Sequence, residues 1–469
     1  MKDRLYMALE RYCRKDILPM HMPGHKRNKK FQMGNPYELD VTEVTGMDDL
    51  HHPTGIIKEL MDQISAMYHS EHSYLLINGS TGGILAAIAA CCRHGDRIVV
   101  ARNCHRSVYH AIRLLELRPV YVYPEPAGSA GERLGIAGEI RAEAVEQVLR
   151  QYDDISCVVI TSPTYEGIVS PIRDIAEVVH RKQLPLIVDE AHGAHFNWHN
   201  AFPDTALTEG ADIVIESLHK TLPAFTQTGL LHVREGFVRL RRLMWSLDTF
   251  QSSSPSYLFM AGIDRCFAYI EEEGAEAFDA YVKNLRDFRE EMRGLKNLYL
   301  FETSAKELSK IVVATDRAGI SGKKLADILC EKYRIETEMS CGNYCIAMTS
   351  VCDERASFRR FADALKEIDD TVLEIAEKND GSLWYDWSAP EICMYSFEAA
   401  DCETESLPVG ESAGRIAGED IYLYPPGIPV VVQGERISEE TAAVLYAGEK
   451  KGYRIYGVRD GMVTVIAEA

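Results

Sequence analysis

Short apolar runs alternate with amphipathic segments through the first half of the chain. The apolar runs predict strands at residues 74–77, 97–100, 119–123, 157–161, 185–188 and 212–215. Segments with the spacing of an amphipathic helix separate most of them, at residues 56–69, 82–92, 106–116, 141–151 and 172–182. Strands that are apolar throughout and joined by helices are typical of parallel sheets buried on both faces. The pattern therefore predicts an α/β fold built on a mostly parallel sheet.

The remaining segments divide the chain further. The charged stretch Glu271–Arg293 has a helical period that suits a connector into a smaller α+β domain. Lys378–Asp386 contains the turn-forming Asn379-Asp-Gly-Ser382 and is typical of a linker. We therefore predict an N-terminal arm at 1–55, a large domain at 56–270, a small domain at 271–380 and a C-terminal module at 381–469.

Composition narrows the function classes. With 469 residues and 46% apolar content, the chain can fill more than one core. Its 51 Lys and Arg against 71 Asp and Glu give a formal charge of −20, which argues against nucleic acid or an anionic membrane surface as a partner. The same charge suits the attraction of a small cationic substrate, although many soluble enzymes are acidic without such a role.

Targeting and metal-binding signals are weak. The first residues are charged where a signal peptide needs an apolar core, and no run approaches the ~20 apolar residues of a membrane span, so we expect a cytoplasmic location. The twelve cysteines lack the paired spacing of a zinc site and suit reduced thiols. His192 and His195 have helical i, i+3 spacing, but this pair alone does not make a metal site, and none is expected.

The segment Glu216–Ala224 carries the strongest chemical signal. It places Ser217, His219 and Lys220 directly after the apolar run Ile213–Ile215. A lysine that is desolvated or near positive charge becomes a nucleophile that forms Schiff bases, and the neighbouring hydroxyl and imidazole can donate to a phosphate. This combination suggests pyridoxal 5'-phosphate as a cofactor. The alternative is a solvated lysine after a buried strand.

A second segment supports the same cofactor. Leu184–His195 predicts a short strand, Leu186–Val188, that leads into Asp189. Ligands bind at the carboxyl ends of strands in open α/β sheets, and a carboxylate there can pair with a protonated pyridine nitrogen. Ala191 is small enough for a flat ring to lie against it. The alternative is that Asp189 caps the turn after the strand.

Two earlier segments complete a cofactor cradle. In Leu75–Gly83 a glycine-rich turn opens a helix, so that backbone N–H groups and the hydroxyls of Ser80 and Thr81 can hold a phosphate. The turn lacks both the G-x-G-x-x-G spacing and the P-loop GK[ST], which weakens dinucleotide and ATP binding as interpretations. His105, in the segment Arg102–Ser107, can stack on the cofactor ring or serve as an ordinary loop histidine.

Nine ordered blocks of sequence point to one family. They are Met22–Lys26, Asp48–Pro53, Asn78–Gly82, Arg102–His105, Ser162–Gly167, Asp189–His192, Ser217–Lys220, Ser252–Tyr257 and Tyr424–Pro429. In these blocks the chain resembles the ornithine/lysine/arginine decarboxylases of the aspartate-aminotransferase fold, which is fold type I of the pyridoxal-phosphate enzymes. The resemblance is to the short bacterial form without an N-terminal wing domain, and it covers nearly the whole chain.

The resemblance implies a role for each matching residue. Lys220 would bind the cofactor covalently, and Asp189 would pair with its pyridine nitrogen. His105 would stack on one face of the ring, with Ala191 beneath the other and His192 near the substrate. The phosphate would be bound by Ser80, Thr81, Gly82, Ser217 and His219, while Ser252 and Ser253 would reach the cofactor of the neighbouring subunit in a homodimer or higher oligomer.

Two positions depart from the family pattern. Leu218 stands where the family usually has Thr, and Ile84 stands where many members have Asn. Neither position is the lysine or the aspartate, so the resemblance still implies the same chemistry.

The resemblance implies decarboxylation of a basic amino acid to the corresponding amine and carbon dioxide, in polyamine metabolism. Arginine is favoured over lysine and ornithine because short members of the family often act on it. Another fold type I enzyme, such as an aminotransferase or a carbon–carbon lyase, and a non-catalytic relative are the alternatives, because fold and cofactor do not select the reaction. The distal cation of the substrate requires an acidic partner. Candidates, each also explicable as a surface charge, are Glu43, Asp48, Asp49, Glu398 and Glu435.

Overall fold

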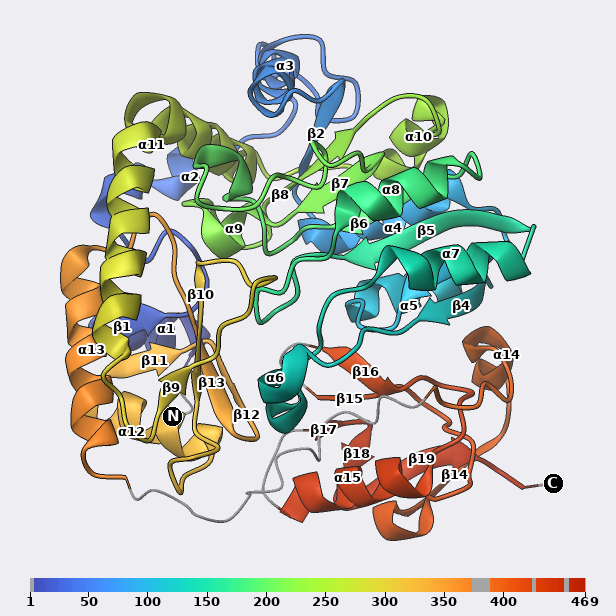
Figure 1. The fold of residues 1–469 in the computed structure, drawn as a ribbon. Helices are drawn as coiled ribbons and strands as arrows, with labels where there is room; N and C mark the ends of the chain where they lie inside the picture. Colours follow the sequence, from blue (N-terminus) through green and yellow to red (C-terminus); the bar gives the residue numbers. More distant parts are fainter. Residues whose placement is uncertain (1–3, 373–388, 424–426, 451–454, 469) are drawn as a thin grey trace.

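A seven-stranded sheet forms the centre of the computed structural model, which describes residues 4–372, 389–423, 427–450 and 455–468 (Figure 1). Its strand order is β2-β8-β7-β6-β5-β3-β4. The five strands β3 to β7 are parallel to one another, whereas β8 is antiparallel to both β7 and β2. The predicted mostly parallel sheet is therefore confirmed. The bounds are β2 (His72–Leu76), β3 (Arg97–Ala101), β4 (Arg118–Val122), β5 (Ile155–Thr161), β6 (Leu186–Asp189), β7 (Ile213–Glu216) and β8 (Gly229–Val233).

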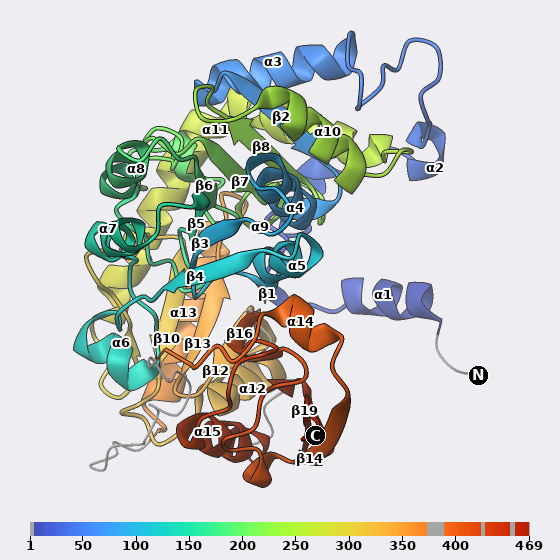
Figure 2. The same cartoon turned by 90° about the vertical axis from the view of Figure 1, so that its right-hand side faces the viewer.

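Helices cover both faces of this sheet (Figure 2). On one face lie α7 (Ala142–Gln151) and α8 (Ile172–His180), and on the other lie α4 (Gly79–Cys91) and α5 (Arg106–Leu114). Strands β6, β7 and β8 are buried at every residue, as their apolar composition requires. Two further helices, α3 (Ile56–Tyr68) and α10 (Leu240–Phe250), pack near β2 and on α4 respectively.

Three features of this part differ from the sequence prediction. Helix α4 begins at Gly79, so the glycine-rich segment forms its first turns. A Cβ atom at Gly83 would lie 2.5 Å from Leu76 Cδ1 and 3.1 Å from Ile215 Cγ2, so a larger residue would force these buried side chains to shift where α4 packs on the sheet. The pattern did not predict β8, nor the short helix α6 (Gly128–Leu134), which contains two glycines and has little apolar period.

The long helix α11 (Tyr257–Met292) leads from the large sheet to a second sheet (Figure 1). It begins well before the predicted connector at Glu271, because its first turns bury apolar side chains such as Ile263 and Phe267. The second sheet is antiparallel, in the order β12-β13-β10-β9. This region contains β9 (Tyr299–Leu300), β10 (Lys310–Ala314), α12 (Gly322–Tyr333), β12 (Met339–Cys341), β13 (Tyr344–Met348) and α13 (Arg355–Asp369).

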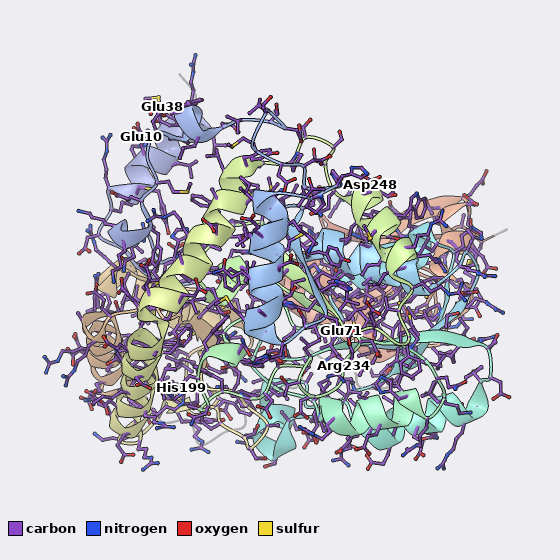
Figure 3. All side chains as sticks on the ribbon, turned by 90° about the horizontal axis from the view of Figure 1, so that it is seen from above. Glu10, Glu38, Glu71, His199, Arg234 and Asp248 are labelled. Atoms are coloured by element: carbon purple, nitrogen blue, oxygen red, sulfur yellow. The ribbon has the colours of Figure 1, made fainter. Side chains whose placement is uncertain are left out.

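The N-terminal residues join the second sheet region rather than the large sheet. Strand β1 (Leu18–Met20) pairs in parallel with β11 (Ile335–Thr337). The flanking elements are α1 (Leu5–Cys13), η1 (Lys29–Phe31) and α2 (Pro36–Leu39). The exposed side chains of Glu10, Glu38 and Asp248 lie on the outer surface of helices (Figure 3).

Within the described residues, no helix combines the length and the apolar character that crossing a membrane requires.

The C-terminal residues form two small antiparallel sheets beside β4 and α5 (Figure 2). One has the order β14-β19-β18 and the other β16-β15-β17. The predicted linker Lys378–Asp386 and part of the predicted turn at Tyr424 lie outside the described residues, and the domain boundaries stay a prediction. The elements are α14 (Ser396–Ala400), β14 (Thr404–Pro408), η4 (Val409–Glu411), β15 (Ile421–Leu423), β16 (Ile428–Val431), α15 (Glu439–Lys450), β17 (Ile455–Tyr456), β18 (Val458–Arg459) and β19 (Met462–Ile466).

Candidate active site

A cavity of ≈ 400 Å³ lies at the carboxyl ends of the central strands. Thr161 and Asp189 are the last residues of β5 and β6, while His105 follows β3 and Lys220 follows β7 in the short helix α9 (Leu218–Thr221). Parallel strands end at the same edge of a sheet, so these residues converge although they are far apart in the sequence. The cavity is lined by Met22, Pro23, Ser80, Asn103, His105, Thr161, Thr164, Tyr165, Asp189, Ala191, His192, His219, Lys220, Thr226, Glu338 and Ile428.

Most residues singled out from the sequence line this cavity, namely Ser80, His105, Asp189, Ala191, His192, His219 and Lys220. Ser217 is fully buried behind them, and its hydroxyl donates a 2.8 Å hydrogen bond to Ser80 Oγ. Thr81 and Ser253 are exposed and Gly82 is buried within α4, so these three do not line the cavity of this chain.

The amine of Lys220 lies 2.9 Å from His192 Nε2. Burial lowers the pKa of Lys220 to about 8, against the opposing charges of Asp189 and Glu338. Burial, and then the charge of Lys220, lower the pKa of His192 well below its usual value, so a neutral imidazole accepts a hydrogen bond from the amine. A lysine with a pKa near 8 is partly unprotonated at neutral pH, as a nucleophile must be.

Asp189 is a buried carboxyl group, 3% exposed, at the end of β6. Its Oδ1 accepts a 3.2 Å hydrogen bond from the backbone N–H of Ala191. Burial raises the pKa of Asp189, and the charge of Lys220 opposes this. A cation placed against a buried carboxylate stabilises its ionised form, so this site fits a protonated pyridine nitrogen.

His105 forms the N-cap of α5, and its Nδ1 accepts a 3.3 Å hydrogen bond from the backbone N–H of Ser107. Burial lowers the pKa of His105 to about 3, with a further contribution from Lys220. The ring is therefore neutral at physiological pH and held in place by its cap. A flat, uncharged ring in this position fits an aromatic cofactor as a stacking partner.

The other end of the cavity suits a phosphate. Ser80 lies in the first turn of α4, where free backbone N–H groups and the helix dipole favour an anion. His219 donates from Nδ1 to the Thr228 carbonyl at 3.0 Å, and burial lowers its pKa to about 4, so the neutral ring carries no proton on Nε2. A phosphate beside this ring would favour its protonated form, in which Nε2 donates. Together with Lys220 and Asp189, this arrangement fits pyridoxal 5'-phosphate.

None of the five acidic residues named as candidates for the partner of the substrate's distal cation lines the cavity of this chain. Asp48 Oδ2 accepts backbone N–H groups at the start of α3, from Gly55 at 2.8 Å and Ile57 at 3.0 Å. Glu435 is paired with Arg102 at 3.1 Å. Of the remaining candidates, Glu43 is exposed, Asp49 accepts the backbone N–H of His51, and Glu398 accepts that of Tyr395.

The carboxylate that does line the cavity with Asp189 is Glu338, which the sequence analysis missed. It lies between β11 and β12. Its Oε1 accepts a 2.5 Å hydrogen bond from the Tyr165 hydroxyl, and its Oε2 accepts a 2.8 Å bond from the backbone N–H of Met22. Tyr165 and Met22 both belong to the sequence blocks that carry the family resemblance. Glu338 belongs to none of them, and a single glutamate between two short strands does not by itself indicate a binding site.

His192 and His195 point to different partners. His192 faces Lys220, whereas His195 Nε2 lies 3.3 Å from Glu307 Oε2. Neither residue is in a helix, so the helical spacing assumed from the sequence does not apply. In the described part of the chain, no group of three or more histidine, cysteine, aspartate or glutamate side chains is arranged to hold a metal ion.

Comparison with known proteins places the chain in a family. Residues 4–311 match the model described as Orn/Lys/Arg decarboxylase, major domain, and residues 390–447 match Orn/Lys/Arg decarboxylase, C-terminal domain. Uncharacterized protein YaaO of Bacillus subtilis (strain 168) is 34% identical over 470 residues, which is 95% of this chain and 94% of that protein. Arginine decarboxylase of the same strain is 28% identical over 485 residues, 99% of this chain and 98% of that protein.

Solved structures show the same fold. Francisella novicida lysine decarboxylase LdcF superposes with a TM-score of 0.79 at 20% identity, over 99% of this chain and 84% of that one. Alanine–glyoxylate aminotransferase from Nostoc sp. superposes with a TM-score of 0.53 at 14% identity, over 66% of this chain and 86% of that one. These similarities confirm the predicted fold class, α/β of fold type I. The chain belongs to the Orn/Lys/Arg decarboxylase family.

Proposed function

We propose that the protein is a pyridoxal-phosphate-dependent decarboxylase of a basic amino acid, with arginine favoured over lysine and ornithine. The observation that carries the proposal is the buried Lys220, whose pKa is lowered to about 8 by burial, in one cavity with Asp189 and His105. Relatives named arginine decarboxylase span nearly the whole chain, which supports arginine. Relatives named lysine decarboxylase keep lysine as the second candidate.

Each residue of the cavity has a task in this proposal. Lys220 would hold the cofactor through its unprotonated amine, and Asp189 would pair with the ring nitrogen. His105 and Ala191 would contact the ring, and His192 would orient the lysine amine. When bound, the cofactor supplies an electron sink for the electron pair that remains on Cα after carbon dioxide leaves. Ser80 and the backbone N–H groups at the start of α4, including those of Thr81 and Gly82, would hold the phosphate together with His219, with Ser217 orienting Ser80 and Ser253 acting from the neighbouring subunit.

Glu338 is our candidate for the partner of the substrate's distal cation. Its carboxylate lines the same cavity as Lys220 and is fixed by the hydrogen bonds from Tyr165 and Met22. Each carboxylate oxygen has a second lone pair, and a guanidinium group can bind both oxygens at once.

A substitution tests this candidate. Glu338→Gln is expected to lower kcat/KM for arginine by about 10 to 100-fold, since hydrogen bonds to a charged group contribute about 1.5–3 kcal/mol. The effect should fall mainly on KM. The matched control is Glu336→Gln, two residues away in β11, whose carboxylate accepts from the Tyr12 hydroxyl and does not line the cavity. Equal kinetics of the two variants would exclude Glu338 as the cation partner.

The primary experiment measures carbon dioxide release from the cofactor-loaded protein, offered arginine, lysine and ornithine separately, with the amine product identified. Release from one of the three supports the decarboxylase and names its substrate. Bound cofactor without release from any of them contradicts the proposal, and amine transfer to a keto acid would then identify an aminotransferase.

We also propose that the active form is a cytoplasmic homodimer that serves polyamine metabolism. Large apolar side chains are exposed on the N-terminal elements and on α10, among them Tyr37 at 88% and Trp245 at 65% exposure, and a subunit contact would cover such groups. All twelve cysteines are free, which suits a reducing compartment. Light scattering tests the dimer. Mixing Lys220→Ala with Ser253→Ala subunits, each inactive alone, should restore activity if active sites are shared.

A further inference from the structure

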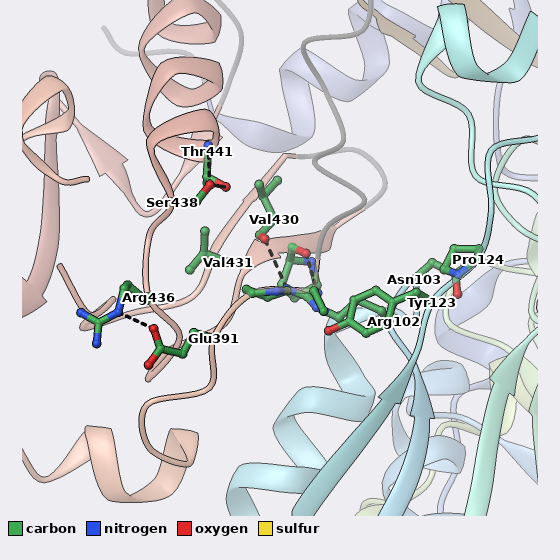
Figure 4. Close-up of a pocket in the computed structure, with 13 residues that line it drawn as sticks. Arg102, Asn103, Tyr123, Pro124, Glu391, Val430, Val431, Arg436, Ser438 and Thr441 are labelled. Carbon is green, nitrogen blue, oxygen red and sulfur yellow. Dashed lines mark hydrogen bonds and ion pairs between the residues drawn. The ribbon is translucent and has the colours of Figure 1, made fainter. Parts of the chain in front are cut away.

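The loop between β3 and α5 is held by the C-terminal residues. Arg102 begins this loop, and its guanidinium donates to the Pro429 carbonyl at 2.7 Å, the Val430 carbonyl at 3.2 Å and Glu435 Oε2 at 3.1 Å. Figure 4 shows Arg102 reaching toward Val430 across the boundary between the two parts of the chain. Three residues further on, the same loop ends in His105, which lines the candidate active site.

The other end of the loop is also hydrogen-bonded to the C-terminal residues. The backbone N–H of Arg106 donates to the Gly427 carbonyl at 3.3 Å, and its guanidinium donates to the Tyr422 hydroxyl at 3.1 Å. Gly427 has a φ of +85°, a conformation that favours glycine, and it turns the chain into β16. The next residue, Ile428, itself lines the active-site cavity. The C-terminal residues therefore contact the loop on both sides of His105.

The Arg102–Glu435 pair is fully enclosed. The side chains are 8% and 2% exposed, and the guanidinium carbon lies 5.4 Å from the centre of the Tyr121 ring. Glu435 Oε2 also accepts the backbone N–H of Val432 at 2.7 Å. Losing one partner would leave an unpaired buried charge, so the two parts of the chain cannot separate here without a large penalty.

Apolar packing alone does not fix the position of the β3–α5 loop against the C-terminal residues. A cavity of ≈ 230 Å³ lies beside the pair and is lined from both sides, by Arg102, Asn103 and Tyr123 on one side and by Pro429, Val430 and Thr441 on the other. Where atoms are not in close contact, dispersion forces set the separation weakly. The directed hydrogen bonds of Arg102 are therefore the contacts that tie the start of the loop to the C-terminal residues.

We propose that the Arg102–Glu435 pair is a positioning device through which the C-terminal module holds His105 against the cofactor ring. The proposal rests on the cofactor site proposed above. Arg102 and Glu435 do not line the active-site cavity and act through the four-residue loop from Arg102 to His105.

The test variant is Glu435→Gln, with Glu435→Asp as the conservative variant that keeps the charge. The matched control is Arg113→Gln, which breaks the 3.0 Å pair with Asp420 between the last turn of α5 and the same C-terminal region, away from the loop. Three quantities are measured: backbone hydrogen exchange of residues 102–106 in the cofactor-free protein, cofactor affinity together with the visible circular dichroism of the bound cofactor, and kcat and KM separately.

Glu435→Gln is expected to speed exchange in the loop at least tenfold, to weaken cofactor binding about tenfold and to lower kcat by about 100-fold, with KM changed less than threefold. Glu435→Asp should recover part of each loss, and Arg113→Gln should stay within twofold of the wild type. If Glu435→Gln does not fold, Glu435→Asp is compared with Arg113→Gln instead. Faster loop exchange and weaker cofactor binding in Glu435→Asp than in Arg113→Gln would then support the proposal.

A folded Glu435→Gln protein with wild-type loop exchange and wild-type circular dichroism overturns the positioning role. If only Glu435→Asp folds, values equal to those of Arg113→Gln overturn it, because the shorter side chain should already loosen the loop. Because hydrogen exchange needs no cofactor, this result is distinct from failure of the proposed function, in which the wild-type protein itself would not bind pyridoxal 5'-phosphate or release carbon dioxide.

Discussion

Replacement of Lys220 by methionine should stabilise the cofactor-free protein at neutral pH. Burial lowers the pKa of this lysine to about 8 from its ordinary value of 10.5. Its folded-state pKa therefore lies below the unfolded value, so the protonated form opposes folding. The penalty is fully present below pH 8 and is lost as the pH rises from 8 through 10.5. Methionine has a similar length and no charge, so it avoids the penalty.

The magnitude follows from the size of the shift. At about 1.4 kcal/mol per pKa unit, the lysine costs about 3 kcal/mol at pH 7 and about 1 kcal/mol at pH 10. The free energy of unfolding of Lys220→Met should thus exceed that of the wild type by up to about 3 kcal/mol at pH 7, and the difference should shrink by about 2 kcal/mol at pH 10. The variant should also lack turnover.

Urea unfolding of the two cofactor-free proteins at pH 7, 8, 9 and 10 measures this difference. The exposed Lys283→Met variant controls for the loss of a lysine. A difference between Lys220→Met and wild type that is independent of pH would refute the reasoning, because it would mean that Lys220 is not desolvated in the folded chain.

Two further predictions test other parts of the argument. Asp189→Asn should still bind the cofactor but lose at least 100-fold in kcat, because an amide does not hold the proton on the ring nitrogen; unchanged kcat would mean that the carboxylate only caps the turn after β6. Gly83→Ala should lower the free energy of unfolding by about 1–3 kcal/mol, because its Cβ would lie 2.5 Å from Leu76 Cδ1. Gly34→Ala, where a Cβ meets no atom within 4 Å, is the control, and equal melting temperatures of the two variants would contradict this packing argument.

Local sequence patterns were sufficient to predict six of the seven strands of the central sheet and much of the site. Apolar runs are a local signal, and every strand that they predicted between residues 74 and 215 is present within a few residues of its expected place. Asp189 ends one of these runs and Lys220 follows another. Because parallel strands end at one edge of the sheet, the sequence was enough to predict that the two side chains lie in one site. The direction of β8 was not predictable, because an apolar run carries no information about its orientation in the sheet.

Which glutamate lines the cavity follows from the three-dimensional packing and could not be predicted from the sequence. Glu435 and Glu338 are alike as single positions in a sequence, yet one is buried against Arg102 and the other lines the site with Lys220. Ile428 reaches the same cavity from a strand more than two hundred residues beyond Lys220. The role of a carboxylate depends on the charges and donors around it, and packing of distant elements, not local pattern, brings those neighbours together.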